Sequence, residues 1–140
     1  WPERDFRTIT PRGELPLVGR PFVLGHYDCW GLVMSYFRQE HDVELKDYRV
    51  DYPWWEDSYP DNFYQDCWYE CGFRELSGPP MHGDLVIMQV QANKWNHAGI
   101  LLNGNILLHH LYGHLSQRIP YGGYWIDRTM KTVRHNILFR

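Results

Sequence analysis

The sequence lacks the features that would place it in several common functional classes. Its three cysteines are an odd number, so they do not indicate a disulfide framework. A net charge of -3 and a pI near 6.2 leave no basic excess to attract nucleic acid. No apolar run approaches the roughly 20 residues that cross a bilayer, and no signal-peptide pattern opens the chain. We therefore expect neither nucleic acid nor membrane insertion among its interactions.

Aromatic residues are abundant instead, at 16% of the chain. Many of them fall in an acidic stretch over residues 42–80, which is predicted to be an insertion. The stretch is either a secondary core beneath a long loop or an exposed surface that contacts a sugar or a partner protein. We expect mixed use of these residues. Phe63, Trp68 and Phe73 should be buried, and Trp54 and Trp55 should be available to a partner.

The 140 residues suffice for one domain with a substantial core, and the elements predict an α+β fold. The apolar spacing after Cys29 predicts a helix from Cys29 to about His41. A second helix is predicted over residues 61–76. Strands are predicted over residues 84–90, 97–102, 106–112 and 132–139. A helix that carries the cysteine is thus followed by an antiparallel sheet that carries the histidines.

Residues 1–20 are rich in proline and glycine, and they are predicted to form an N-terminal arm or linker. The domain itself is predicted to span residues 21–140. The first residue is Trp1 rather than methionine, so we expect this chain to be part of a longer protein with a preceding domain.

Cys29 is the residue whose context is most informative. It stands at the predicted start of a helix, where the positive end of the helix dipole is expected to lower the pKa of a thiol. A lone cysteine in a helix is more often a buried core residue. Here His97 opens one predicted strand and His109 and His110 close the next. Cysteine first and histidine later is the order found in thiol proteases.

The register of the hairpin around Asn103-Gly104-Asn105 decides which histidine can reach His97. A two-residue loop places His97 opposite His110, and an Asn-Gly pair favours this loop. A three-residue loop pairs Leu102 with Ile106 and puts His109 on the same face as His97, one diagonal away. The residues alone leave both registers open.

Cys67 and Cys71 lie four residues apart on the predicted helix over residues 61–76, so they share one face. Half of a zinc site would be possible there, but no second pair of Cys or His residues has suitable spacing. We expect two packed free thiols and no metal.

Four stretches in this order resemble the NlpC family of cell-wall cysteine peptidases, which have a small papain-like fold. They are GRPFVLG at residues 19–25, DCWGLV at 28–33, GDLV at 83–86 and NHAGI at 96–100 followed by His109. The variant YDCWG at 27–31, the aromatic insertion and HHLYG at 109–113 are most similar to the members of that family in lambda-type phage tail tips. In such proteins an isopeptidase-like domain precedes the NlpC domain.

The resemblance implies a role for each site residue. Cys29 would be the nucleophile, His97 the general base and His109 the group that orients His97; the family spacing thus selects the three-residue hairpin loop. Tyr27, Asp28 and Trp30 would line the substrate-binding end of the cleft. No metal or other cofactor is required.

The chain departs from the family pattern at two positions. Phe22 stands where the family has a tyrosine, so a hydroxyl near the site is lost, and Tyr27 is one candidate to replace it. Trp30 stands where the family has a serine, and it is expected to narrow the cleft or to stack on the substrate.

The implied function is hydrolysis of bacterial peptidoglycan at a stem-peptide amide, with D-glutamate to diamino acid as the expected bond. The protein would be made in the host cytoplasm, join phage tail-tip proteins and act at the host periplasm. Two alternatives remain open. One is a tail-tip assembly or structural protein with idle chemistry, and the other is a protease that matures a tail protein.

Overall fold

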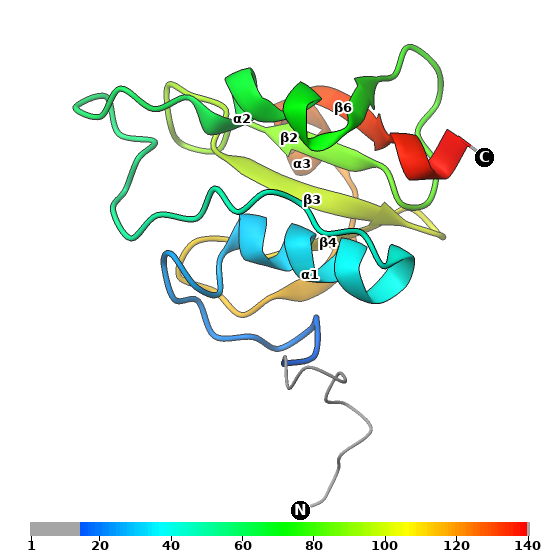
Figure 1. The fold of residues 1–140 in the computed structure, drawn as a ribbon, viewed down its shortest axis with the longest axis horizontal. Coiled ribbons are helices and arrows are strands. Elements are labelled where there is room, and N and C mark those ends of the chain that lie inside the picture. Colours follow the sequence, from blue (N-terminus) through cyan, green and yellow to red (C-terminus); the bar gives the residue numbers. More distant parts are fainter. Residues whose placement is uncertain (1–14, 140) are drawn as a thin grey trace, which may run out of the picture.

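The computed structural model describes residues 15–139, which form an antiparallel sheet with helices against it (Figure 1). The six strands run in the order β1-β6-β2-β3-β4-β5. Their bounds are Phe73–Glu75 (β1), Leu85–Met88 (β2), His97–Leu102 (β3), Ile106–His109 (β4), Gln117–Pro120 (β5) and Thr129–His135 (β6). The helices are α1 (Cys29–His41), α2 (Phe63–Cys67) and α3 (Gly123–Arg128), with 3-10 turns η2 (Tyr69–Cys71) and η3 (Asn136–Phe139). The predicted α+β class is confirmed.

Helix α1 has the bounds that its sequence predicts, because both ends carry local stop signals. At the start, Asp28 Oδ1 accepts a hydrogen bond from the Gly31 N–H at 2.8 Å, which satisfies one of the unpaired donors of the first turn. At the end, Asp42 takes a left-handed conformation and its N–H bonds back to Arg38 and Phe37. The helix therefore begins at Cys29 itself, with the thiol in its first turn.

The sheet is covered on both faces. Leu85, Ile87 and Ile100 belong to the core cluster that also contains the apolar residues of α1, which packs on β3 and β4. Val86 and Met88, the alternate residues of β2, join the cluster that Trp125 of α3 covers. Alternate side chains of a strand point to opposite faces of the sheet. Because both faces are covered at β2, all of its side chains are apolar, which explains the unbroken apolar run in the sequence.

Asp84, just before β2, is fully buried and bound by Arg134 of β6. The Arg134 Nε and Nη2 atoms donate to the two carboxylate oxygens at 2.7 and 2.9 Å, and the Met81 N–H donates to Oδ2 at 2.8 Å. A buried carboxylate needs such partners, and the bidentate guanidinium supplies both charge and geometry. This pairing accounts for the aspartate in the GDLV stretch.

The helix predicted over residues 61–76 is wrong. Only α2 and η2 are helical, and the chain then enters β1, where Phe73 is fully buried and pairs with His135 of β6. Gly72, with φ of 92°, provides the left-handed turn between η2 and β1. Residues 73–75 thus form an edge strand of the sheet, although their spacing in the sequence favours a helix.

The other predicted strands differ mainly at their ends. The strand over residues 84–90 shortens to β2, and the one over 106–112 stops at His109. The last strand begins at Thr129 and turns into η3 at Asn136. Of the predicted arm, residues 1–14 lie outside the described range. Its last residue is part of the domain, because Arg20 is buried and its guanidinium bonds to Leu15 O, Pro16 O and Ser35 Oγ.

The β3–β4 hairpin has the three-residue register, with Leu102 paired to Ile106 and Gly99 to His109. Gly99 lies between the histidine positions at a point of close approach. A Cβ atom at Gly99 would stand 2.6 Å from Leu107 Cδ1 and 2.8 Å from Leu108 O. Only glycine lets the two strands come together here, and His97 and His109 meet across it.

The insertion over residues 42–80 is tied to the β2–β3 loop by Lys94. This side chain is buried, and its ammonium donates to the carbonyl oxygens of Trp54 (3.0 Å), Tyr59 (2.6 Å) and Asp61 (2.7 Å). An ammonium has three donors, so all of them are used on this one loop. Lys94 therefore fixes the loop that leads into α2.

Replacing Lys94 by methionine should lower the free energy of unfolding by about 2 kcal/mol, because three carbonyls, one buried and two partly buried, lose a charged donor. Urea unfolding followed by tryptophan fluorescence measures the change. Lys46→Met is the matched control: Lys46 lies exposed in the same insertion, and a change within about 0.5 kcal/mol is expected. Equal losses in the two variants would show that the ammonium bonds of Lys94 contribute nothing specific.

None of the helices within residues 15–139 has the length and apolar character to cross a membrane.

Candidate active site

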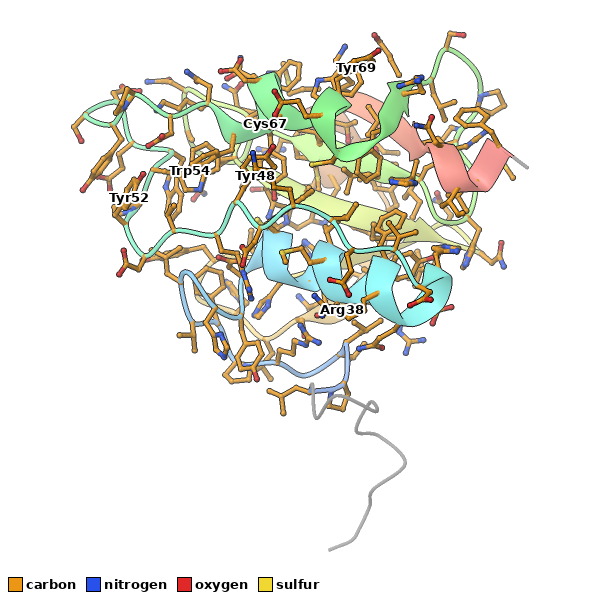
Figure 2. All side chains as sticks on the ribbon, viewed as in Figure 1. Arg38, Tyr48, Tyr52, Trp54, Cys67 and Tyr69 are labelled. Carbon is orange, nitrogen blue, oxygen red and sulfur yellow. The ribbon has the colours of Figure 1, made fainter. Side chains whose placement is uncertain are left out.

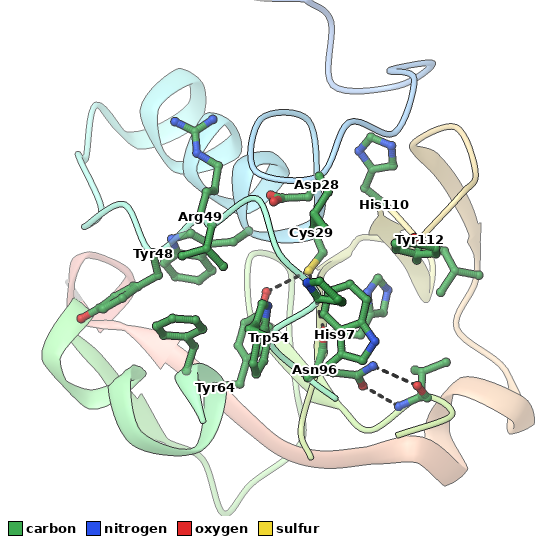
Figure 3. Close-up of a pocket in the computed structure, with 18 of the residues that line it drawn as sticks. Asp28, Cys29, Tyr48, Arg49, Trp54, Tyr64, Asn96, His97, His110 and Tyr112 are labelled. Atoms are coloured by element: carbon green, nitrogen blue, oxygen red, sulfur yellow. Dashed lines mark hydrogen bonds between the residues drawn. The ribbon is translucent and has the colours of Figure 1, made fainter. Parts of the chain in front are cut away.

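A cleft of about 470 Å³ opens at the N-terminal end of α1 (Figure 3). One wall comes from the insertion, including Tyr48, Trp54 and Tyr64. The opposite wall comes from the segment after β4, including His110 and Tyr112. Cys29 and His97 lie between the two walls. The volume is in the range of small-molecule and peptide-binding sites.

The Cys29 sulfur lies beside the start of β3. It is 4.0 Å from the Asn96 carbonyl oxygen, and the Ala98 N–H also acts on it. These two residues flank His97. Asn96 is held by a pair of side-chain bonds to the Val90 backbone, at 2.7 Å to its N–H and 2.9 Å to its carbonyl (Figure 3). The segment that presents His97 is therefore fixed before the strand begins.

His97 and His109 form a direct hydrogen bond, with 2.9 Å between His97 Nε2 and His109 Nδ1. Both rings are buried. Since Nε2 is taken, Nδ1 is the His97 nitrogen left to serve Cys29. To accept a proton there, neutral His97 must carry its own proton on Nε2 and donate it to His109 Nδ1. The geometry therefore assigns the proton of His109 to Nε2.

The Nε2 atom of His109 has no hydrogen-bond partner within the described part of the chain. The ring instead packs edge-on with the Trp125 indole, with ring centroids 4.7 Å apart at an angle of 75°. The Trp125 indole thus packs directly against the His109 ring. The polar partner of His109 is therefore His97.

His110 lies in the cleft wall and is engaged elsewhere. Its Nε2 is 3.0 Å from the His114 carbonyl oxygen, and its ring meets the edge of Phe22 with centroids 5.2 Å apart. It faces neither ring nitrogen of His97. The two-residue hairpin loop would have reversed the places of His109 and His110.

The prediction of a lowered thiol pKa is wrong for this structure. Burial raises the pKa of Cys29 to about 12, and the negative charge of Asp28 adds to the rise. Burial also lowers the pKa of His97 well below its usual value, with further lowering from His109 and His110. Desolvation of both groups outweighs the helix terminus. Both shifts favour the neutral form of each group in the resting site.

Tyr64 of α2 closes over the nucleophile. Its hydroxyl lies 3.1 Å from the Cys29 sulfur, and its ring is buried against Trp30 and Trp54, with centroids 5.9 and 6.0 Å away. Burial raises the pKa of Tyr64 well above its usual value, and the neighbouring Cys29 raises it further. The hydroxyl therefore keeps its proton and can donate to the sulfur.

The predicted substrate-binding residues fare differently. Asp28 lines the cleft, but both carboxylate oxygens accept backbone N–H groups, from Gly31 at 2.8 Å and Gly25 at 3.0 Å. Trp30 is buried in the cleft wall and donates its indole N–H to the Lys46 carbonyl at 2.8 Å. Tyr27 is not among the residues that line the cleft; it packs on His26 and beneath the Arg20 guanidinium. Asp28 acts as the helix cap here, Trp30 forms a wall, and Tyr27 lies elsewhere.

The aromatic residues of the insertion form a connected cluster. Phe73 is buried as predicted, and Phe63 and Trp68 pack partly buried against the core. The prediction that Trp54 is free for a partner is wrong, because only 8% of it is exposed and its carbonyl is held by Lys94. Trp55 is partly exposed and meets Tyr112 across the cleft, with centroids 5.4 Å apart.

Cys67 and Cys71 are free thiols of intermediate exposure. Both line the same cleft, on the side of the insertion, where the Tyr48 hydroxyl lies near them (Figure 2). Burial raises the pKa of Cys71 to about 11. Among residues 15–139, no group of three or more His, Cys, Asp and Glu side chains is placed to hold a metal ion.

Three residues that shape the site were not found from the sequence: Tyr64, Lys94 and Asn96. Asn96 had a signal, since it directly precedes His97 in a recognisable stretch. Tyr64 and Lys94 had none. Each acts on a partner more than 30 positions away in sequence, and only packing brings them together.

A sequence profile described as the NlpC/P60 family matches residues 19–134. The tail tip assembly protein K of Escherichia phage N15 is 83% identical over 135 residues, which cover 96% of this chain and 56% of that protein. The protein of the same name from Escherichia phage lambda is 29% identical over 120 residues, which cover 85% of this chain and 59% of that protein. The chain thus spans little more than half the length of these relatives.

Solved structures show the same fold. One, described as similar to a lipoprotein of the NLP/P60 family from Staphylococcus aureus, has a TM-score of 0.58 at 22% identity and covers 85% of this chain and 37% of its own. The NlpC/p60 domain of the peptidoglycan hydrolase SagA has a TM-score of 0.52 at 16% identity, with 84% of this chain and 88% of that domain covered. At these identities the likeness is one of fold.

Proposed function

The chain belongs to the NlpC/P60 family, and from this premise we propose that it is a thiol-dependent peptidoglycan hydrolase of a phage tail tip. It cuts an amide of the stem peptide, with the bond from D-glutamate to the diamino acid as the expected one. The observation that supports this most is that Cys29 and His97 line one cleft, with the Cys29 sulfur 4.0 Å from the carbonyl oxygen of Asn96, the residue before His97, and with His109 Nδ1 2.9 Å from His97 Nε2. The action opens the host wall locally, at its periplasmic side, during infection.

The first half of the reaction is acylation of Cys29. His97 Nδ1 takes the thiol proton as the sulfur attacks the carbonyl carbon, so no free thiolate has to exist beforehand. The Cys29 backbone N–H, in the first turn of α1, is oriented to donate to the oxygen that becomes negative. When the tetrahedral intermediate collapses, the C–N bond breaks and His97 returns the proton to the leaving amine. A thioester on Cys29 remains.

The second half is hydrolysis of the thioester. Water enters in place of the amine and gives a proton to His97 Nδ1 as its oxygen attacks the carbonyl carbon. The C–S bond then breaks, the proton returns to the sulfur, and the carboxylic acid leaves. Throughout, His109 Nδ1 accepts the hydrogen bond from His97 Nε2 and stabilises the imidazolium that forms in each half.

The test is incubation of this protein with peptidoglycan purified from Escherichia. The expected result is release of fragments with new amino groups and no new reducing sugar ends. Protein alkylated at its thiols beforehand should release none. Absence of new amino groups with the unmodified protein would reject the proposal, as would new reducing ends.

One observation favours a second function. The relative that is 83% identical is called a tail tip assembly protein, and here the Tyr64 hydroxyl lies 3.1 Å from the Cys29 sulfur, a thiol whose pKa is raised by burial. A structural or maturation role for this domain in the tail tip is consistent with both facts. A phage whose protein carries Cys29→Ala separates the cases. Missing tails would favour maturation, assembled tails that fail to infect would favour wall hydrolysis, and assembled, infectious phage would favour a structural role.

A further inference from the structure

We infer that Tyr64 is a catalytic residue, whose hydroxyl donates a hydrogen bond to the Cys29 sulfur and then to the oxyanion of the substrate. The inference rests on the proposed thiol chemistry and extends it. It assigns a chemical role to the aromatic insertion, beyond forming one wall of the cleft. The insertion thereby completes the site from a part of the chain that is distant in sequence.

The contact is direct and geometrically suitable. The Tyr64 oxygen is 3.1 Å from the sulfur, which is within reach of a hydrogen bond to sulfur. When the sulfur bonds to a carbonyl carbon, the carbonyl oxygen lies roughly 3 Å from that sulfur, because the two atoms share one tetrahedral carbon. A donor already at the sulfur therefore needs to shift little to reach the oxygen. It can follow the negative charge from one atom to the other.

Packing around the ring fixes the position of the Tyr64 hydroxyl. Tyr64 is 6% exposed, and its ring is fixed between two indoles, Trp30 and Trp54. Trp30 is anchored by its N–H bond to the Lys46 carbonyl, and the Trp54 carbonyl is bound by Lys94. A preorganised donor loses little entropy during the reaction, which is the condition for an effective oxyanion contact.

No other tyrosine hydroxyl is assigned to the sulfur in the described range. Phe22, which lines the same cleft, has no hydroxyl and turns its ring to His110 and Tyr112. The Tyr48 hydroxyl bonds to Glu70 at 3.0 Å, and the Tyr52 hydroxyl to Asp61 at 3.0 Å. Tyr64 is thus the side chain placed to share the charge with the backbone N–H of Cys29.

The experiment compares Tyr64→Phe with the wild type in a chain that has Cys67→Ala and Cys71→Ala, so that only Cys29 is alkylated. The rate of alkylation by iodoacetamide against pH reports the thiol without any substrate. Loss of the hydroxyl should raise the apparent thiol pKa and slow alkylation at a given pH. On peptidoglycan, kcat should fall on the order of 100-fold, with a smaller change in KM.

Tyr52→Phe is the matched control, because it removes a hydroxyl from the same insertion away from the cleft and should change neither readout. An unchanged alkylation profile in Tyr64→Phe would overturn the inference. Faster alkylation and faster hydrolysis would also overturn it, since the hydroxyl would then be a shield. If the wild type cuts no peptidoglycan while Tyr64→Phe still slows alkylation, the proposed function fails and the bond from Tyr64 to Cys29 stands.

Discussion

Cys29→Ala should reduce peptidoglycan hydrolysis by at least roughly 10⁴-fold, because Cys29 is the proposed nucleophile of the covalent route. The sulfur lies beside the start of β3, where His97 stands, and the alanine side chain can form no acyl intermediate. The loss should appear in kcat with little change in substrate binding, since the cleft walls stay in place. The measurement is release of new amino groups from purified peptidoglycan, alongside thermal unfolding to confirm that the variant is folded.

The matched control is the double variant Cys67→Ala with Cys71→Ala, which should retain most of the activity. These thiols line the same cleft, but their neighbour is the Tyr48 hydroxyl rather than the imidazole of His97. Residual hydrolysis of more than a few per cent in Cys29→Ala would show that Cys29 is not the nucleophile. If the double variant is inactive and Cys29→Ala is active, the nucleophile is Cys67 or Cys71 of the insertion.

Part of the site was predictable because its determinants are local. The aspartate before Cys29 and the apolar spacing after it predict a helix from Cys29 to about His41, which agrees with α1. His97 is the first residue of β3, as the pattern over residues 97–102 predicts. The length of the hairpin loop has no such local determinant, since Asn-Gly alone favours a loop of two residues. The structure uses three, with Gly104 and Asn105 both at positive φ. Short-range turn chemistry allowed both registers, and packing of the strand faces selected one.

Other parts depend on contacts between distant residues. The helical pattern of residues 61–76 gives way at Phe73, whose burial against Phe37 and pairing with β6 stabilise a strand. The raised pKa of Cys29 follows from its burial in the folded chain, which its position at the helix start does not reveal. The same holds for Tyr64, since many tyrosines share its stretch and only the fold selects one. Tertiary packing overrides local preference in each case.

His109→Ala should lower kcat by about 10³-fold or more, because His97 would lose the group that fixes its tautomer. With His109 Nδ1 gone, the His97 proton is free to move from Nε2 to Nδ1, and a ring protonated at Nδ1 cannot take a proton from Cys29. Burial also lowers the pKa of His109 to about 4, so near neutral pH the ring is neutral, and its Nε2–H tautomer leaves the Nδ1 lone pair for His97. The measurement is kcat on peptidoglycan in folded variants.

The conservative variant separates orientation from packing. In His109→Asn the side-chain oxygen can stand near the place of Nδ1 and accept the same bond, so a substantial part of the activity should return relative to His109→Ala. A purely structural role would leave the two variants equally impaired.

His110→Ala is the matched comparison on the neighbouring residue. It should lower kcat less than about tenfold, because His110 bonds to the His114 carbonyl and not to His97. If His110→Ala is instead the inactive variant and His109→Ala is active, the bond of 2.9 Å between His97 and His109 does not serve the reaction. The orienting group would then lie in the cleft wall after β4, and the hairpin register would have to differ in the working enzyme.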